Sequence, residues 1–459
     1  MKIRSLLLGS VAAAGLSTGA FAADLGVLTS LDVCDALGLS GLTISSDTNC
    51  LQITGGVNYA FSWGDYQDDA LLGVTEDDST SVLNDGWTDD EDFNLEWDSR
   101  LESWIQFVAT ADSDFGPAKA VLKLKDVKDI RFYDEGHLSS TTGSDTGGVI
   151  MDQAYVAIGD STVIMAGKKS SIINFGDDAP LNFLGLFNSS NVDVGVKWDE
   201  VVVDEFVDDG GVVIQVTSDL GNGLSIGVGL ENLNDSNPAQ AGVLAGVIAY
   251  AGDGISAHVS VAGGGVLDGT IENWGIHAGF TGTFDAFKVV AAVAADDTEY
   301  WNALASVSAT FDMFTLAISG EAAADRDPAL KGTSAAITGD TDYGFGASAG
   351  FAVTDGVKIN IGGRWYHDAF EDNNFYQVAA QVVATVTESI TLTGEVGMYA
   401  SDVDTLAYGD AGEANAEDAF YGSAQVAWAP GGGFTSSLKG EVYSNGAYKA
   451  TFKAAKTFE

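Results

Sequence analysis

Strict alternation of apolar and polar side chains between Leu51 and Trp63 limits how this chain can fold more than any other feature. Successive side chains of a β-strand point to opposite faces, so the pattern predicts a strand with one apolar and one polar face. The apolar face consists of Leu51, Ile53, Val57, Tyr59, Phe61 and Trp63. Aromatic residues at one end of that face are typical of a strand that reaches a membrane–water interface. If later segments repeat the pattern, the chain is expected to form a membrane barrel.

The N-terminus has the pattern of a secretory signal peptide. Lys2 and Arg4 precede an apolar run, residues 6–16, that is too short to span a bilayer. The small-x-small pattern Ala20-Phe21-Ala22 follows, as at a cleavage site. We predict that residues 1–22 are a signal peptide, the alternative being a buried N-terminal helix. No later segment offers roughly twenty uninterrupted apolar residues, so no helical span is expected.

Composition favours one large β-domain, which we place at residues 51–459. The chain has 57 glycines and only five prolines, and the interior of a β-sheet excludes proline. No linker-like tract divides the chain into separate domains. Its formal net charge of −46 argues against a nucleic-acid partner, because binding phosphates requires Lys and Arg.

The two cysteines, Cys34 and Cys50, lie in a secreted context and are predicted to form one disulfide. The bridge would hold the N-terminal segment 23–50 beside the first strand. The alternative is a pair of free thiols. Metal binding by the pair is disfavoured because no histidine lies within a dozen residues of either.

Alternation returns along the chain, but its polar face now carries charges. In the second strand this face holds Glu96, Asp98, Arg100, Glu102 and Gln106, and in the third it holds Lys119, Lys123 and Lys125. Charged side chains face lipid at mid-depth only at a cost of a few kcal/mol each, so a membrane barrel must point them into water. A soluble sandwich would instead expose them on its outer surface.

The lengths of the connections favour the barrel over the sandwich. Long connections, such as 64–92, 133–149, 325–341 and 402–417, alternate with tight turns, as in an outer-membrane barrel. We predict an all-β, antiparallel, up-and-down transmembrane barrel with an even number of strands. The count is twenty, at residues 51–63, 93–111, 118–132, 150–159, 162–169, 211–220, 224–233, 242–252, 255–266, 272–285, 287–297, 301–312, 314–324, 342–354, 357–368, 374–388, 390–401, 418–429, 434–445 and 448–458. The first and last of these are expected to pair and close the barrel.

Three segments resemble the alphaproteobacterial porin family: MKIRSLLLGS, VCDA…NCLQITGGVNYAF and AYVAIGDSTVIMAGKKSS. The resemblance covers about the first 170 residues. It implies a homotrimer in outer-membrane lipid and lipopolysaccharide whose water-filled barrels admit ions and small hydrophilic solutes. It also implies a constriction loop within residues 170–210 that folds inward. Two features depart from the family: its usual barrel has sixteen strands, and its members end on an aromatic residue, whereas this chain ends in Glu459.

Basic residues are expected to gather on one inner wall, because the second and third strands neighbour the last two across the closing seam. This basic wall comprises Arg100, Lys119, Lys123, Lys125, Lys439, Lys449 and Lys453. The inward loop offers Asp177 and Asp178, so a transverse field would cross the pore and disfavour apolar solutes. Alternatively, these cations are ordinary pore charges paired with Glu96, Glu102 and Glu441.

A second charge signal is acidic. Residues 64–92 contain eleven Asp or Glu and no Lys or Arg, as expected of a solvated loop. Clustered carboxylates also suit Ca²⁺, although no calcium motif is present. Either way the pore mouth would concentrate cations, so we predict a modest cation preference.

No enzymatic function is expected, and no cofactor or specific metal site is predicted. The four histidines are scattered along the sequence and none lies in a catalytic or metal motif. Three functions remain. They are a general diffusion channel, which is favoured; a substrate-specific channel with saturable conductance; and a calcium-bridged surface or adhesive protein without conductance.

Overall fold

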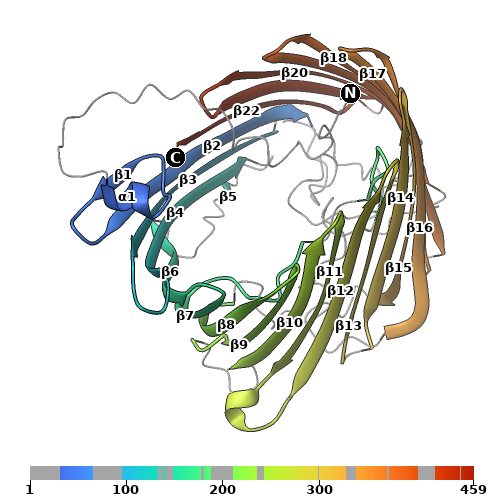
Figure 1. Ribbon diagram of the computed structural model, residues 1–459. Coiled ribbons are helices and arrows are strands. Elements are labelled where there is room, and N and C mark those ends of the chain that lie inside the picture. Colours follow the sequence, from blue (N-terminus) through green and yellow to red (C-terminus); the bar gives the residue numbers. More distant parts are fainter. Residues whose placement is uncertain are drawn as a thin grey trace.

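The computed structural model describes residues 32–65, 96–132, 138–139, 148–176, 180–187, 210–234, 242–297, 299–326, 337–369, 372–401, 419–444 and 446–458. Within these residues the chain forms one closed, antiparallel β-barrel with twenty spanning strands (Figure 1). The predicted fold class and strand number are therefore confirmed, and the sixteen strands implied by the family resemblance are wrong for this chain.

The spanning strands follow one another around the barrel in sequence order. They are β2 (Cys50–Asp65), β3 (Glu96–Ala111), β4 (Ala118–Phe132), β6 (Ile150–Gly159), β7 (Thr162–Lys168), β8 (Val212–Gly221), β9 (Leu224–Glu231), β10 (Val243–Gly252), β11 (Ile255–Gly264), β12 (Asn273–Phe284), β13 (Phe287–Asp296), β14 (Trp301–Phe311), β15 (Phe314–Arg326), β16 (Ile337–Thr354), β17 (Val357–Asp368), β18 (Asn373–Thr387), β19 (Ile390–Ser401), β20 (Ala419–Gly431), β21 (Phe434–Tyr443) and β22 (Tyr448–Phe458). Two short strands, β1 (Thr43–Ser45) and β5 (Leu138–Ser139), pair with β2 and β4.

The barrel closes where β2 pairs with β22. Their register runs from Gly55 opposite Phe458 to Asp65 opposite Tyr448, as the sequence predicted for the first and last strands. Beyond Gly55, the same edge of β2 pairs with β1, because Gln52 lies opposite Thr43. Strand β1 therefore lies beside the first residues of β2, which β22 does not reach because it ends at Phe458.

Apolar side chains cover the outside of the barrel and polar ones its inside. On β15, Leu316 and Ile318 are 51% and 54% exposed, whereas Ser319, on the other face of the strand, is 2% exposed. Such an outer surface would be unstable in water and is suited to lipid. Alternation along each strand thus sets which residues line the lumen.

The predicted disulfide is present at the start of β2. Cys34 lies in the short helix α1 (Asp32–Ala36), its Cα atom is 5.0 Å from that of Cys50, and both residues are buried. Neither α1 nor β1 was expected from the sequence. Within the described residues, no helix has the length and apolar character needed to cross a membrane.

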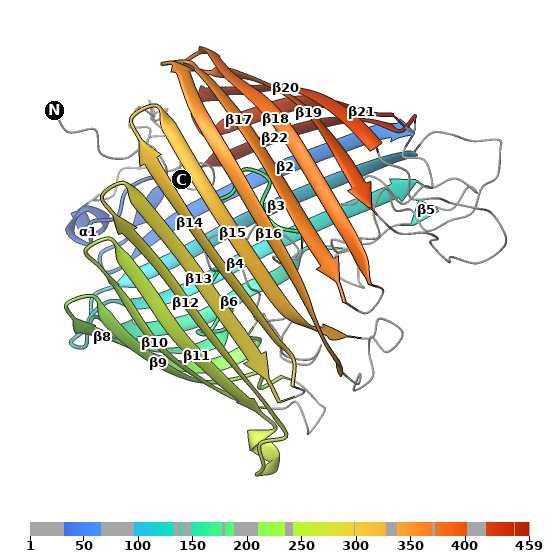
Figure 2. The same ribbon diagram turned by 90° about the vertical axis from the view of Figure 1, so that its right-hand side faces the viewer.

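Tight hairpins join the strands at one end of the barrel. Figure 2 shows the turns of β8–β9, β10–β11 and β14–β15 at the same end as α1. At the β8–β9 turn, Asn222 and Gly223 both have positive φ, of 53° and 81°. Two-residue turns of this kind match the twist of paired strands. Turns occupy residues 222–223, 253–254 and 285–286, between strands that the sequence predicted.

Candidate pore and its inner loop

The seven residues of the predicted basic wall lie on the lumen face of four strands around the closing seam: β21, β22, β3 and β4. Lys453 lies opposite Ala60, and Ala60 lies opposite Arg100. Only the small side chain of Ala60 therefore separates these two cations in the sheet.

Carboxylates pair with Lys123, Lys439, Lys125 and Arg100 of this wall. The distances are 2.6 Å for Lys123–Asp152 and Lys439–Glu441, 3.4 Å for Lys125–Glu102 and 4.0 Å for Arg100–Asp129. Two of these partners, Glu102 and Glu441, are acids that the sequence offered as the alternative to a free basic wall. The wall is thus a mixed-charge surface. Within the described residues, no carboxylate lies within 4.0 Å of the Lys453 ammonium, and its side chain is exposed.

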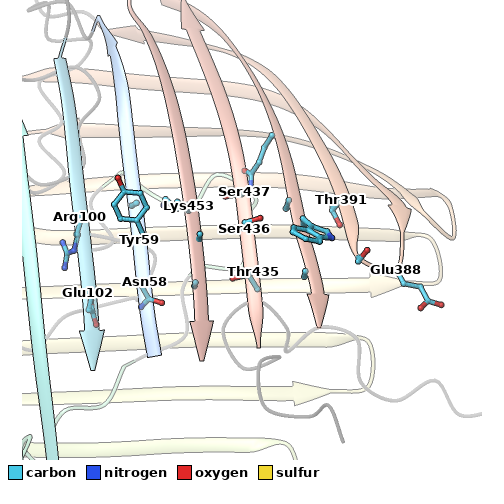
Figure 3. Close-up of a pocket in the computed structure, with 18 residues that line it drawn as sticks. Asn58, Tyr59, Arg100, Glu102, Glu388, Thr391, Thr435, Ser436, Ser437 and Lys453 are labelled. Atoms are coloured by element: carbon cyan, nitrogen blue, oxygen red, sulfur yellow. The ribbon is translucent and has the colours of Figure 1, made fainter. Parts of the chain in front are cut away.

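A cavity of about 530 Å³ lies against this wall, between β19 and β3 (Figure 3). Its charged lining residues are Arg100, Glu102, Glu388 and Lys453. Side-chain amides and hydroxyls make up most of the remaining polar lining: Asn58, Ser389, Thr391, Gln425, Thr435 and Ser437. The charged, amide and hydroxyl groups of this lining can form hydrogen bonds with water and with polar solutes.

The segment after β7 enters the barrel and is fastened to β8 and β9. The backbone N–H of Ile172 donates to Glu231 Oε1 (3.1 Å), and Gln215 Nε2 donates to the same oxygen (2.8 Å) and to the Ser170 carbonyl (3.1 Å). Burial lowers the pKa of Lys169, which lies just beyond β7, and the charge of Glu231 opposes this shift. These contacts fix where the inner loop begins.

Phe175 continues the loop along the lumen wall. Its ring stacks on His258 with 4.4 Å between ring centres, and His258 in turn makes an edge contact with His277 at 4.8 Å. The two histidines are nineteen positions apart in sequence, but β11 and β12 place them side by side. Among the described residues, no group of three or more His, Cys, Asp or Glu side chains is arranged to hold a metal ion.

The second half of the loop follows the wall as far as β17. The N–H of Leu181 donates to Ser306 Oγ (2.8 Å), and the N–H of Phe183 donates to Ser348 Oγ (2.9 Å). Arg364 then donates to the Leu186 carbonyl (2.8 Å). The described loop thus spans β9 to β17, on the side of the barrel opposite the basic wall.

A row of polar side chains extends from the end of the loop along the wall. Arg364 Nε donates to Gln377 Oε1 (2.6 Å), Gln377 Nε2 to the Tyr421 hydroxyl (2.9 Å), and that hydroxyl to Glu395 Oε1 (2.8 Å). Alternation along β17 puts Arg364 on the lumen face, but its role in holding the loop is not visible from the sequence. Its partners lie in the loop and on β18, so the path of the loop and the register of β17 with β18 determine these contacts.

Several predicted residues cannot be placed. Asp177, Asp178, the predicted signal peptide 1–22 and the acidic segment 66–92 lie outside the described residues.

Comparison with known proteins gives one family and several remote structural likenesses. The profile of a family described as "Porin subfamily" matches residues 30–439. An anion-selective porin from Comamonas acidovorans is 13% identical, covering 89% of this chain and 100% of that one, with a TM-score of 0.39. Pseudomonas aeruginosa OccK5 (OpdH) is 7% identical over 89% and 98% of the two chains (TM-score 0.39), and a mutant of the Rh. blastica porin is 12% identical over 89% and 100% (TM-score 0.35). No curated protein matches the chain.

Proposed function

The chain belongs to the porin subfamily and forms an outer-membrane channel for passive diffusion, and we propose that this channel passes ions and small hydrophilic solutes with a modest preference for cations. The observation that carries the proposed preference is the pairing of Arg100, Lys123, Lys125 and Lys439 with carboxylates. Paired charges largely cancel for an ion passing at a distance. The formal charge of −46 then sets the sign of the potential at the pore.

The experiment is a reversal-potential measurement on the purified protein in a planar bilayer under a KCl gradient. A cation preference gives a reversal potential with the sign of the K⁺ equilibrium potential, and its size should fall as ionic strength rises because salt screens the acidic charge. A reversal potential of the opposite sign would show that the basic residues of the pore dominate, and would overturn the proposal.

The inner loop is proposed to narrow the pore and to set up a transverse field. Its described part lies opposite the basic wall, and Asp177 and Asp178 belong to the same loop. A field between acids and bases holds water in the narrow zone and disfavours apolar solutes. The D177N/D178N double variant should admit apolar solutes relatively faster in liposome-swelling assays. Unchanged relative rates would mean that the field does not act at the constriction.

The chain is further proposed to assemble as a homotrimer, as the family resemblance implies. A substrate-specific channel is the second candidate function, and the polar cavity between β19 and β3 is the observation that favours it. Conductance that saturates with one solute, and is blocked by it, would identify a specific channel, whereas conductance proportional to concentration for every solute would identify general diffusion.

A further inference from the structure

The polar cavity between β19 and β3 has two unlike ends. Directly opposite residues form one row across its lumen face: Arg100, Ala60, Lys453, Ser437, Ala427 and Thr391. The row faces the lumen, because Phe452, the neighbour of Lys453 on β22, is 41% exposed on the outer face. Figure 3 shows Arg100 at one side of the cavity and Thr391 at the other. The cations are thus at the β3 and β22 end, and hydroxyls follow towards β19.

The cationic end suits a single negative charge. Arg100 and Lys453 are two strands apart, so their Cα atoms are roughly 10 Å apart at the usual strand spacing, and both side chains can reach one group between them. The acids beside them are already paired, Asp129 with Arg100 (4.0 Å) and Glu102 with Lys125 (3.4 Å). The charge left over is mainly that of Lys453. It matches a carboxylate better than a phosphate monoester, which carries more than one negative charge at neutral pH.

The opposite end suits an uncharged body rich in hydroxyl groups. Its hydroxyl and amide lining groups belong to Ser437, Thr435, Thr391, Ser389 and Gln425. Such groups both donate and accept hydrogen bonds, as the hydroxyls of a sugar do. Glu388, in the turn between β18 and β19, adds a carboxylate at this end. A carboxylate accepts hydrogen bonds from hydroxyls but repels a second anionic group, so only one end of a ligand can be negative.

We propose that this cavity is a binding site for a sugar acid, with the carboxylate between Arg100 and Lys453 and the sugar hydroxyls along β21, β20 and β19. From Lys453 to Thr391 the row crosses three strand spacings, roughly 14 Å. The cavity volume of about 530 Å³ is in the range of small-molecule sites. An acid of two sugar units reaches both ends. This inference rests on the proposed channel and names the substrate class of its substrate-specific form.

The first test measures block of the wild-type channel in a planar bilayer by three probes at constant K⁺ concentration. Lactobionate has the carboxylate and the hydroxyls, lactose has only the hydroxyls, and acetate has only the charge. Lactobionate should block the single-channel current saturably, with a half-blocking concentration at least about tenfold below that of lactose or acetate, because each control contacts one end only. Similar block by all three probes, or no saturable block, would overturn the inference and leave the diffusion channel standing. Absence of conductance would refute the channel itself.

Variants then locate the site. K453Q should raise the half-blocking concentration of lactobionate about tenfold and leave that of lactose unchanged, because it removes a charged contact. S437A should raise both about threefold, because it removes a neutral hydrogen bond. K358Q, which removes a lumen cation of β17 outside the cavity lining, should change neither. Conductance without sugar shows that each variant is folded. Unchanged block in K453Q and S437A, or an equal loss in K358Q, would place binding elsewhere and overturn the inference.

Discussion

The guanidinium of Arg364 lies over the ring of Phe187, with its central carbon 4.0 Å from the ring centre. The same group donates to the Leu186 carbonyl from NH1 and to Gln377 from Nε. One side chain on β17 therefore binds the far end of the inner loop by a ring contact and a charged hydrogen bond. Glu231 plays the corresponding part at the near end, where it accepts the N–H of Ile172.

Replacing Arg364 with alanine should release the far end of the loop. A hydrogen bond from a charged group contributes about 1.5–3 kcal/mol, and the cation–π contact adds to it. We expect R364A to show larger and noisier single-channel conductance and to admit larger sugars in liposome swelling. R364K keeps the positive charge but lacks the planar guanidinium that donates to Gln377 and to the Leu186 carbonyl from two different nitrogens. We therefore expect R364K to resemble R364A more than the wild type.

The matched control for that prediction is K358A, which removes a lumen cation from the same strand. Both variants lose one positive charge, so a change caused by charge alone would appear in both. Equal conductance noise and size cut-off in R364A and K358A would contradict a tethering role for Arg364.

How much of this structure could be predicted from sequence depends on the range of the interactions involved. Alternation is local, so strand positions, turn positions and the pairing of β2 with β22 followed from the sequence. The alternation of 118–125 breaks at Asp126 on β4, and this break is visible in the sequence as well.

Contacts between distant strands could not be predicted in the same way. Arg364 and Leu186 are 178 positions apart, and Leu181 and Ser306 are 125 apart. Their meeting depends on the path of the loop, which has no periodic pattern. The ion pairs of the basic wall raise the same difficulty, because Lys123 meets Asp152 only at an irregularity in the β4–β6 register.

Neutralising Lys453 should increase the preference for cations. Its ammonium is exposed beside the cavity, and no described carboxylate lies within 4.0 Å to cancel its charge. We expect K453Q to raise the K⁺/Cl⁻ permeability ratio in reversal-potential measurements. K456Q, on the outer face of the same strand, should change it less. A larger effect from K456Q would place the selective part of the pore elsewhere.

Removing the disulfide should weaken the N-terminal end of the closing seam. The bridge joins residues 16 apart, and closing a loop of this size contributes about 3 kcal/mol on the chain-entropy model. We expect the C34S/C50S variant to unfold at a lower temperature in heat-modifiability gels, and reductant to lower the midpoint of the wild type but not of the variant. Equal midpoints for oxidised and reduced wild type would show that this segment unfolds independently of the barrel.

Gly64 controls the closure of the barrel at the other end of the seam. A Cβ atom at this position would overlap the carbonyl oxygen of Tyr448 and lie 3.0 Å from the Lys449 Cα atom. Because the obstructing atoms belong to the backbone of β22, the strands must separate to admit a methyl group. We expect G64A to destabilise the folded barrel by about 1–3 kcal/mol, the usual effect of overpacking. Gly440, on β21, has no atom within 4 Å of the same position, so G440A should leave the unfolding midpoint unchanged. If both variants unfold at the same denaturant concentration as the wild type, close approach of β2 and β22 is not what Gly64 provides.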